Sequence, residues 1–428
     1  MKRTLISSLG ECINEKVSIK GWVHRIRALK SVTFIVLRDR SGMVQCVMDK
    51  SFDLGGIRNE AVVEVEGTVQ EGKNSLHNYE LIGEVFKILS EVKEELPIEI
   101  NKENLEASLE TILNNRVLSL RNQKKNAIFR VQHIIVEGFR EYLSREGFIE
   151  IFTPKIVAEG AEGGTALFKL DYFGRDAYLA QSPQFYKQMM VAAGYERVFE
   201  IGNFFRAEEH DTSRHLNQFT SMDLEMAFIE DEKDVMDIEE ALLKYILVKL
   251  ETEGAQHFTL LEAELPQISA PIPRIDFSEA VKILGERYNK VIEDIDLDPE
   301  GEKLISRYAK EELDSDFIFV TNYSRDKRPM YTMPKGESGT KSFDLIFRGM
   351  EITSGGQRIH NYDMLVENFI RKGLNPGDFQ NYVEVFKYGV PPHGGLAIGL
   401  ERLLALLLGI NNVRETSLFP RDKNRLTP

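Results

Sequence analysis

The sequence predicts an α+β protein of two domains, and three observations support this fold class. Residues 17–90 alternate apolar and polar side chains in short runs rich in β-branched residues, which is typical of strands. From residue 126 the apolar positions recur with a helical period, which indicates an amphipathic helix. Later strand-like and helix-like segments come in blocks without regular βαβ alternation, which favours a mostly antiparallel sheet flanked by helices.

Composition narrows the class of protein. The 428 residues are 42% hydrophobic and 29% charged, as in ordinary globular proteins. The longest apolar run, LLALLLGI at 403–410, is too short to span a bilayer, and the N-terminus has no apolar core of a secretion signal. Cys12 and Cys46 form no disulfide framework or metal motif, so we expect a reducing, cytoplasmic location.

Charge is spread unevenly along the chain. The formal net charge is −14, yet residues 1–50 hold ten Lys and Arg against four Asp and Glu, a balance of +6. This pattern predicts that any polyanion contacts the N-terminal part of an otherwise acidic protein. The alternative is chance clustering on a solvated face.

The first domain is predicted to be a small barrel. Four strand-like runs are punctuated by Ser41-Gly42 and Gly67: VSIKGWVHRIR, TFIVLRDRSGMVQCVM, AVVEVEGTVQ and YELIGEVFKIL. Short strands that close within about 90 residues indicate a barrel of the oligonucleotide-binding kind, here assigned to residues 1–95. A polar, charged stretch with Pro97 follows, and we place a linker at 96–125.

The second domain is assigned to residues 126–428. An acidic segment at 255–315 gives no indication of its function. The expected elements are a helix at 126–145, a strand in FIEIFTPKIV broken by Pro154, a helix near 232–252, strand, turn and strand at 343–360, and a glycine-spaced strand entering an apolar helix at 391–409.

One stretch, FFRAEEHDTSRHLNQF at 204–219, places many charges between apolar segments. A solvated hairpin would explain the charges through solubility alone. Alternatively, Arg206 and His215 stand on paired strands and hold a polyanion, while Phe219 offers a ring on which a base can stack.

Three segments together resemble a known family. FIEIFTPKIV, FRAEEHDTSRHLNQF and GGLAIGLERLL are similar, in this order, to motifs 1, 2 and 3 of class II aminoacyl-tRNA synthetases. Within subclass IIb the chain resembles aspartyl-tRNA synthetases of the archaeal and eukaryotic type. The markers are EGGTALF, QSPQFYKQ, MDLEMAF, FDLIFRGMEITSGGQRIH and FPRDKNRLTP. The resemblance implies an OB-fold anticodon-binding domain followed by a class II catalytic domain with an antiparallel sheet.

The resemblance implies a nucleotide site built on motifs 2 and 3. Arg206 would contact the substrate carboxylate and the α-phosphate, and Arg402 the γ-phosphate, which makes these two the catalytic residues. Phe219 would stack on adenine and Glu208 would accept from its amino group. Gly394, Gly395 and Gly399 would let adenine approach the backbone. The full ATP-binding set is Arg206, Ala207, Glu208, Arg214, His215, Leu216, Phe219, Glu351, Gly399, Leu400, Glu401 and Arg402.

The family's magnesium ligands match Glu351 and Ser354, with Asp344 as a second carboxylate. Mg²⁺ accepts hard oxygen ligands and bridges phosphates of its substrate, here ATP. For Asp344 a purely structural hydrogen bond is the competing interpretation.

The amino-acid pocket should bind a side-chain carboxylate. Lys187 and Arg358 match the family's cationic pair, with Asp223 orienting them. Asparaginyl enzymes typically carry Glu at the position of Asp223, so aspartate is favoured over asparagine. A surface position for Lys187 is the alternative. The remaining expected contacts of L-aspartate are Glu162, Ser182, Gln184, Phe185, Tyr186, Arg206 and Ser354.

In the barrel, Phe34 and Gln45 are spaced like the residues that stack on an anticodon base and bond the central uracil. Alternatively, both belong to the barrel core. His24 occupies the position where relatives specific for tRNA(Asp) tend to carry tryptophan, supported by a lysine in the later loop. The corresponding loop here, EGKNSLHNYE, has only Lys73 nearby. We therefore expect relaxed recognition of the third anticodon base.

The sequence thus predicts an aspartate–tRNA ligase that uses ATP and Mg²⁺ and charges tRNA(Asp) and also tRNA(Asn). It would be a homodimer with Pro154 at the interface, without DNA or membrane partners. The competing functions are an asparagine–tRNA ligase, a paralogue that makes asparagine from aspartyl-adenylate, and an RNA-binding regulator with an inactive catalytic domain.

Overall fold

The chain folds as two compact units, residues 1–122 and 123–428. The computed structural model describes residues 1–52, 54, 56–72, 74, 76–160, 166–209, 211–269, 271–293 and 295–428. The division between the units falls within the stretch predicted to be a linker. This stretch is partly helical, because α1 (Leu109–Asn114) and α2 (Arg116–Ser119) lie in it and belong to the first unit.

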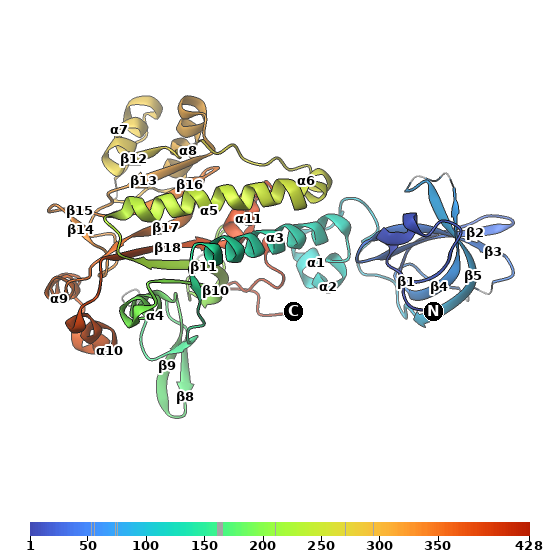
Figure 1. Ribbon diagram of the computed structural model, residues 1–428, viewed down its shortest axis with the longest axis horizontal. Coiled ribbons are helices and arrows are strands. Elements are labelled where there is room, and N and C mark those ends of the chain that lie inside the picture. Colours follow the sequence, from blue (N-terminus) through green and yellow to red (C-terminus); the bar gives the residue numbers. More distant parts are fainter. Residues whose placement is uncertain are drawn as a thin grey trace. The chain divides into compact units, whose positions relative to one another are not determined.

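The first unit contains the predicted closed barrel, drawn in blue in Figure 1, with strand order β1-β2-β3-β5-β4. All pairings are antiparallel except that of β3 with β5. Alternate residues such as Ile35, Leu37 and Val44 fill the interior, as the alternating sequence predicts. The elements are η1 (Ile6–Glu11), β1 (Lys16–Ala28), β2 (Val32–Asp39), β3 (Gly42–Asp49), β4 (Val62–Glu71) and β5 (Tyr79–Ser90).

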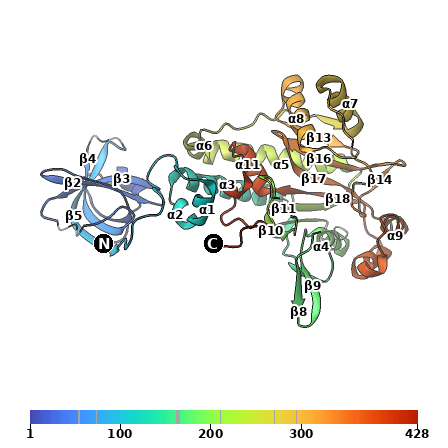
Figure 2. The same cartoon turned by 180° about the vertical axis from the view of Figure 1, so that it is seen from behind.

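The second unit is built on an eight-stranded sheet with the order β12-β13-β16-β17-β18-β11-β10-β6 (Figure 2). It is antiparallel except where β6 pairs with β10 and β12 with β13, which confirms the predicted α+β class. The strands are β6 (Ile149–Glu150), β10 (Arg197–Phe205), β11 (Gln218–Ala227), β12 (Arg274–Asp276), β13 (Phe317–Thr321), β16 (Ser342–Phe347), β17 (Met350–Arg358) and β18 (His393–Gly399).

Two long helices, α3 and α5, lie side by side across one face of this sheet (Figure 1). The main hydrophobic core fills the space between these two helices and the sheet. There the ring of Phe139 in α3 meets the ring of Phe199 in β10 edge to face, with 5.9 Å between the ring centroids. The helices are α3 (Gln123–Arg145), α4 (Gln184–Met190), α5 (Glu232–Glu253), α6 (Ala255–Leu261), α7 (Phe277–Tyr288), α8 (Pro299–Leu313), α9 (Tyr362–Arg371), α10 (Gln380–Val383) and α11 (Leu400–Leu407). In the described part of the chain no helix is long and apolar enough to cross a membrane.

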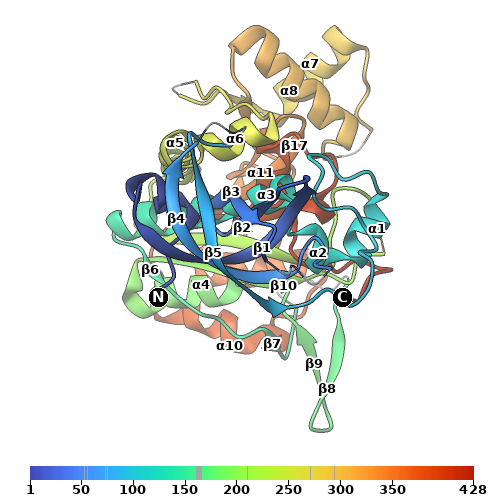
Figure 3. The same ribbon diagram turned by 90° about the vertical axis from the view of Figure 1, so that its right-hand side faces the viewer.

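Several short elements were not expected from the sequence. A hairpin of β8 and β9 projects from the second unit, as Figure 3 shows, and joins β7 in a small sheet. Of these elements, β7 (Ile156–Val157) falls in FIEIFTPKIV, where the sequence predicts a strand. The unexpected elements are β8 (Lys169–Tyr172), β9 (Arg175–Leu179), β14 (Pro334–Lys335), β15 (Gly339–Thr340), η2 (Val191–Tyr195), η3 (Pro376–Phe379), η4 (Glu384–Tyr388) and η5 (Val413–Thr416). Each spans two to five residues, too few to produce a recognisable period.

The core beneath α5 contains a buried acid, Glu239. Within the described residues neither of its carboxylate oxygens has a hydrogen-bond partner, although the Thr353 hydroxyl is close enough to favour the ionised form. Burial therefore raises the pKa of Glu239 to about 8. At neutral pH this side chain is protonated, since an isolated carboxylate would be costly in the core.

Glu239 should make the stability of the protein fall as the pH rises. Between its unfolded pKa of 4.5 and its folded pKa of about 8, only the folded state binds this proton. Each pH unit in that window therefore costs about 1.4 kcal/mol of unfolding free energy. The thermal unfolding midpoint of Glu239→Gln should drop less between pH 6 and pH 8 than that of the wild type. Glu251→Gln, exposed on the same helix, is the control. If the unfolding midpoints of Glu239→Gln and wild type fell equally with pH, the raised pKa of Glu239 would be contradicted.

Candidate active site

A cavity of about 150 Å³ lies where β11, β17 and β18 meet the start of α11. It gathers residues from both motif 2 and motif 3, together with β17. Its lining comprises Arg206, Glu208, Arg214, His215, Leu216, Phe219, Ser221, Glu351, Ile352, Ser354, Ala397, Gly399, Glu401, Arg402 and Val413. Most residues predicted to bind ATP therefore converge on one cavity.

The motif 2 segment is a hairpin, but Arg206 and His215 do not stand on its paired strands. Arg206 and His215 lie in the loop between Phe205, where β10 ends, and Gln218, where β11 begins. Asn217 pins this loop, because its amide donates to the carbonyls of Arg206 (2.7 Å) and Glu208 (2.9 Å). The prediction that strand pairing positions these charges was therefore wrong.

Phe219 presents its ring to the cavity, and the guanidinium of Arg206 lies over it, 5.3 Å from the ring centroid. His215 is held by Thr212, whose hydroxyl lies 2.6 Å from Nδ1. A planar apolar surface and several cations thus share one cavity, which suits a ligand with an aromatic base and a polyanionic tail.

In the described part of the chain, the Arg402 guanidinium donates its hydrogen bonds to backbone carbonyls. Its Nη1 donates to the carbonyl of Glu351 (3.2 Å) and its Nε to that of Arg214 (3.4 Å). These neutral acceptors orient the guanidinium, and the carboxylates of Glu351 and Glu302 lie near enough to interact with its charge. Glu401 beside it has a structural contact instead: both carboxylate oxygens accept from the Thr220 N–H at 3.0 Å, and burial raises the pKa of Glu401 to about 7.

Not every predicted nucleotide contact reaches this cavity. The side chain of Leu400 packs in the main core. Ala207 lines a neighbouring cavity that is shared with residues 421–426. The backbone N–H of Asn217 donates to the carbonyl of Arg421 (2.8 Å), so the C-terminal segment closes this side of the motif 2 loop.

Two of the three motif 3 glycines have roles other than the one predicted. A Cβ at Gly394 would lie 2.7 Å from a core methyl group of Ile229. A Cβ at Gly395 would lie 2.1 Å from a carboxylate oxygen of Glu225. Only Gly399 lines the cavity. The first two glycines therefore make room for protein side chains rather than for adenine.

Of the three predicted metal ligands, Glu351 and Ser354 line the cavity. Asp344 is buried next to it and accepts from Arg328 Nη2 at 2.5 Å, while Arg328 Nη1 donates to the Ser354 hydroxyl at 2.9 Å. The other oxygen of Asp344, Oδ1, is buried without a partner in the described structure. Burial, with Asp344 nearby, raises the pKa of Glu351 to about 7.

No group of three or more His, Cys, Asp or Glu side chains within the described residues is arranged as a metal cage. Glu351 and Ser354 nevertheless provide one carboxylate and one hydroxyl in the lining of a cavity that suits a polyanionic ligand. Mg²⁺ usually binds through one or two carboxylates, waters and substrate phosphates, so this donor set is compatible with it.

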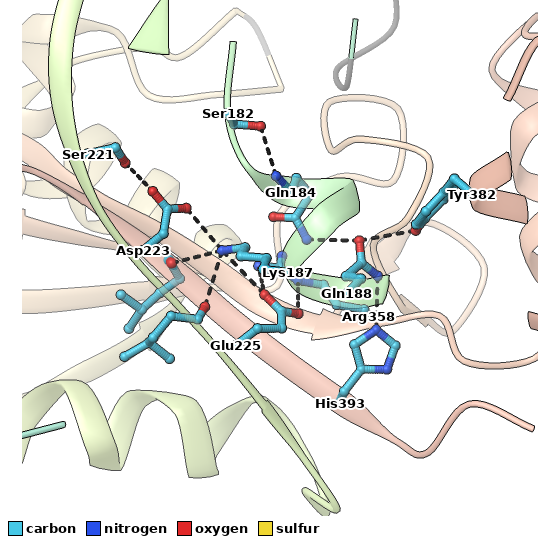
Figure 4. Close-up of polar contacts among 12 residues, drawn as sticks. Ser182, Gln184, Lys187, Gln188, Ser221, Asp223, Glu225, Arg358, Tyr382 and His393 are labelled. Carbon is cyan, nitrogen blue, oxygen red and sulfur yellow. Dashed lines mark hydrogen bonds and ion pairs between the residues drawn. The ribbon is translucent and has the colours of Figure 1, made fainter. Parts of the chain in front are cut away.

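Lys187 of α4 is buried at the centre of a charged cluster (Figure 4). Its Nζ contacts Asp223 Oδ1 (3.1 Å), Glu225 Oε2 (3.3 Å) and the carbonyls of Leu224 (3.2 Å) and Leu396 (3.0 Å). These contacts occupy all three N–H donors of the ammonium group. Lys187 is therefore not a surface lysine, and it has no donor to spare.

Arg358 completes the cluster by donating from Nε (3.0 Å) and Nη2 (3.3 Å) to the carboxylate of Glu225 (Figure 4). Its Nη1 has no hydrogen-bond partner in the described part of the chain. Burial opposes ionisation of Glu225, but Arg358 and Lys187 hold the pKa of Glu225 below its usual value. For Asp223 burial outweighs the lysine, so the pKa of Asp223 is raised. When ionised, two cations and two carboxylates give this cluster no net charge.

The predicted pocket residues Ser182, Phe185 and Tyr186 line a second cavity beside α4. Gln184 is buried and donates to Gln188 Oε1 at 2.9 Å. Gln188 Oε1 also accepts from the Tyr382 hydroxyl (3.1 Å), and Gln188 Nε2 lies 2.9 Å from His393 Nε2. These side chains form a polar network next to the charged cluster. Glu162 and Lys73 lie outside the described residues.

The sheet register relates the two predicted substrate sites. Asp223 of β11 pairs with Ala397 of β18, which pairs with Ser354 of β17, which pairs with Asp344 of β16. Ser221, which lines the nucleotide cavity, donates to Asp223 at 2.5 Å. One row of paired residues across four strands thus places the charged cluster beside the cavity.

Sequence reasoning missed several members of this site. Glu225 could have been found, because MDLEM places it two residues after Asp223 and therefore on the same face of a strand. Arg328 stands in a loop without a recognisable pattern. Gln188 and His393 meet across a sequence separation of 205 residues, and no local signal reports such a contact.

In the barrel, Phe34 and Gln45 both point away from the core. Phe34 pairs with Val47 and with Arg27, and Gln45 pairs with Val36, so these side chains share the outer surface of β1, β2 and β3. Their neighbours Ile35 and Cys46 fill the interior. The alternative that Phe34 and Gln45 belong to the barrel core is therefore wrong.

His24 stands at an irregularity in β1 and is half-buried. Arg38 Nη1 lies 3.0 Å from its Nδ1, and Arg38 Nη2 donates to both carboxylate oxygens of Glu60. A guanidinium can only donate, so Nδ1 must be the acceptor and the ring proton resides on Nε2. Burial, then Arg38, lowers the pKa of His24 to about 4.

Pro154 is exposed in the segment between β6 and β7. Large apolar side chains around it are exposed as well, including Phe152 (82%), Ile149 (49%) and Ile156 (49%). The short strand β6 also forms the edge of the main sheet. An exposed apolar patch at a sheet edge is typical of a surface that another chain covers.

Comparisons with known proteins agree with this geometry. The sequence model described as tRNA synthetases class II (D, K and N) matches residues 108–423, and that of the OB-fold nucleic acid binding domain matches residues 17–89. The chain is 48% identical to the aspartate–tRNA(Asp/Asn) ligase of Deinococcus radiodurans, over 100% of this chain and 99% of the relative. It is 44% identical to the aspartate–tRNA(Asp) ligase of Pyrococcus abyssi, over 100% of both.

Solved structures are similar over the full chain. The asparaginyl-tRNA synthetase of Pyrococcus horikoshii, complexed with asparaginyl-adenylate, superimposes with a TM-score of 0.92 at 30% identity, covering 100% of both chains. The aspartyl-tRNA synthetase of Entamoeba histolytica gives a TM-score of 0.89 at 30% identity, covering 100% of this chain and 93% of that one.

Replacement of Glu225 should be severely destabilising. Glu225→Gln keeps the shape of the side chain but leaves Lys187 and Arg358 buried with a single carboxylate, and a buried unpaired charge costs about 3–5 kcal/mol. The midpoint of denaturant-induced unfolding of the catalytic unit should fall accordingly. Glu230→Gln, an exposed acid shortly after the same strand, serves as the control. An unchanged midpoint for Glu225→Gln would show that the cluster is not what holds these cations.

Proposed function

Since the chain belongs to the class II tRNA synthetase family of the D, K and N enzymes, we propose that it is an aspartate–tRNA ligase. In this function a carboxylate oxygen of aspartate attacks the α-phosphate of ATP and pyrophosphate leaves. A hydroxyl of the tRNA 3′-terminal ribose then attacks the carbonyl carbon of the adenylate and AMP leaves. One observation carries the proposal. A cluster of charged side chains without net charge, centred on Lys187, lies beside a nucleotide cavity that is lined by cations.

On the nucleotide side, Phe219 provides the stacking surface for adenine and Glu208 accepts from its amino group. Arg206 lines the same cavity and, in this proposal, contacts both the substrate carboxylate and the α-phosphate. A fixed cation there stabilises the transition state more than the ground state, because negative charge grows on the phosphate during attack. Arg402, whose hydrogen bonds in the described structure go to carbonyls, is the proposed contact of the terminal phosphates.

Mg²⁺ is part of the proposal. Glu351 and Ser354 would hold it, and the ion would neutralise charge on the ATP phosphates. Asp344 is engaged with Arg328 through one oxygen, so its contribution is to orient Arg328 and, through it, Ser354.

In binding the amino acid, the two cations of the cluster have different roles in this proposal. Every N–H of Lys187 is engaged within the protein, whereas Nη1 of Arg358 remains available. Arg358 therefore grips the side-chain carboxylate of aspartate directly, and Lys187 contributes charge and fixes β11. The asparagine side chain has no negative charge, and one of its two terminal groups is an NH2 donor that Arg358 cannot accept from, so we propose that asparagine is rejected.

The quaternary state follows from the exposed segment around Pro154. We assign this segment to the interface of a homodimer, in which the partner covers Phe152 and the edge strand β6. A cytoplasmic location, expected from the free Cys12 and Cys46, completes the proposal.

The tRNA partner is read by the outer surface of the barrel. Phe34 stacks on an anticodon base, and exposed Arg25 and Arg27 on the neighbouring strand supply positive charge for the phosphates. Gln45 Nε2 donates to the carboxylate of Glu80 at 2.8 Å in this structure. In the proposal, Gln45 exchanges this hydrogen bond for one to the central uracil.

At the third anticodon base the proposal is relaxed specificity. The neutral His24 tautomer set by Arg38 offers one N–H donor at Nε2 and no acceptor. Cytosine and uracil both carry the O2 acceptor that such a donor can use, and stacking does not distinguish them. The name of the Deinococcus relative includes both tRNAs, which agrees with this proposal, whereas that of the Pyrococcus abyssi relative includes only tRNA(Asp).

Amino-acid choice is tested by the exchange of labelled pyrophosphate into ATP. Aspartate should support exchange and asparagine should not, because the side-chain carboxylate forms a charge-assisted hydrogen bond to Arg358 that a neutral amide cannot form. Arg402→Ala, which should lower exchange by orders of magnitude, is the negative control. Equal exchange with asparagine would favour an asparagine–tRNA ligase, and no exchange with either would favour an RNA-binding regulator.

Specificity for tRNA is tested with transcripts that differ only at the third anticodon base. The kcat/KM values for aspartylation should agree within about tenfold, since one shared donor gives little discrimination. Phe34→Ala should lower both values together, because lost stacking costs about 1–3 kcal/mol for either base. A hundredfold preference for cytosine would refute relaxed specificity.

A further inference from the structure

The acidic segment 255–315, whose function the sequence does not reveal, reaches the nucleotide cavity through α8. This helix begins at Pro299 and is capped by Asp298, whose side chain accepts from the Gly301 N–H at 2.7 Å. Two acids follow in the first turn. Glu300 is exposed, whereas Glu302 is turned inward and only 7% exposed.

One oxygen of Glu302 bonds two residues that line the cavity. Oε2 accepts from Arg214 Nη2 at 2.5 Å and from the backbone N–H of Glu351 at 3.2 Å. Arg402 in turn donates to the carbonyls of Arg214 and Glu351. Glu302, Arg214, Arg402 and Glu351, from four separate segments, therefore form a closed ring of hydrogen bonds.

An acid in this position has an electrostatic cost. A carboxylate beside a cavity for polyphosphate repels the ligand, so charge complementarity alone does not explain its presence. Holding a guanidinium in place does explain it, because a long cation that is already ordered loses less entropy when the ligand arrives. In the described structure the Nε of Arg214 is buried and has no partner, so Glu302 is the only side chain that orients this guanidinium.

We propose that Glu302 is a positioning residue for the nucleotide: it holds Arg214 against the cavity so that its guanidinium is ready for the phosphates of ATP. The inference rests on the proposed function in that it takes ATP as the ligand. It also gives the segment 255–315 a function, since α8 carries the support for the motif 2 loop. Glu302 itself contacts no phosphate.

Equilibrium binding of ATP with Mg²⁺, measured by calorimetry without amino acid or tRNA, tests this directly. Glu302→Ala should weaken ATP binding at least about tenfold, the equivalent of one charge-assisted hydrogen bond. Glu302→Gln keeps an acceptor at the same place and should stay within about threefold. Glu300→Ala, an identical truncation on the same turn, should bind like the wild type.

A double-mutant cycle separates positioning from general structural support. If Glu302 acts through Arg214, then Glu302→Ala should have almost no further effect on ATP affinity in an Arg214→Ala background. In pyrophosphate exchange the KM for ATP should rise in Glu302→Ala while the KM for aspartate stays unchanged. An equal loss of affinity in both backgrounds, or unchanged affinity in the single variant, would overturn the proposal.

Glu302→Asp keeps the experiment decisive if Glu302→Ala does not fold. Aspartate preserves the charge but is one methylene too short to reach Arg214, so it should reproduce the loss of ATP affinity. Normal binding by this variant would refute the positioning role. Because ATP binding is measured without amino acid, a wild type that binds ATP but shows no aspartate-dependent exchange would refute the proposed function alone.

Discussion

The buried cluster of Lys187, Asp223, Glu225 and Arg358 is the interaction on which the rest of the structure depends. Four charged groups can be buried together only if every one of them is matched, since a single unpaired charge would cost several kcal/mol. This requirement fixes α4 against β11, because Lys187 must reach both acids and the carbonyl of Leu396. It also requires glycine at position 395, where any side chain would collide with Glu225.

The two halves of the site use opposite electrostatic strategies. Around Lys187 each cation faces a carboxylate, so the cluster is rigid and nearly neutral. One additional charge, such as the side-chain carboxylate of a bound amino acid, therefore changes its net charge. In the nucleotide cavity, Arg402 is oriented by peptide carbonyls, which direct it without cancelling its charge. A neutral, ordered pocket suits selection between similar amino acids, whereas a cavity lined by several guanidinium groups suits a polyanion.

Sequence alone predicted the parts of the molecule that depend on periodicity or on contiguous motifs. The barrel, α3, the β10–β11 hairpin and the strand that enters α11 all follow from apolar spacing, and the structure has each of them. The convergence of Arg206, Phe219 and Arg402 followed from the family resemblance, while the roles of these residues in catalysis stay predictions. What could not be predicted depends on side-chain geometry between distant segments. Examples are the Glu302–Arg214 contact, the grip of Arg328 on Asp344, and the packing function of Gly394, because single residues in loops and turns carry no repeat.

The order of the strands has a consequence for how the chain is made. β18 is the last strand of the main sheet in the sequence, yet it lies between β11 and β17, near the middle of the sheet. While a ribosome is still producing the chain, both of these neighbours must wait with an unpaired edge, and Lys187 still lacks the carbonyl of Leu396. Exposed edges are prone to mispairing, so the nascent catalytic unit is the stage at which a chaperone would matter most. Once β18 has paired with β11 and β17, both of these edges are covered and the folded sheet no longer exposes them.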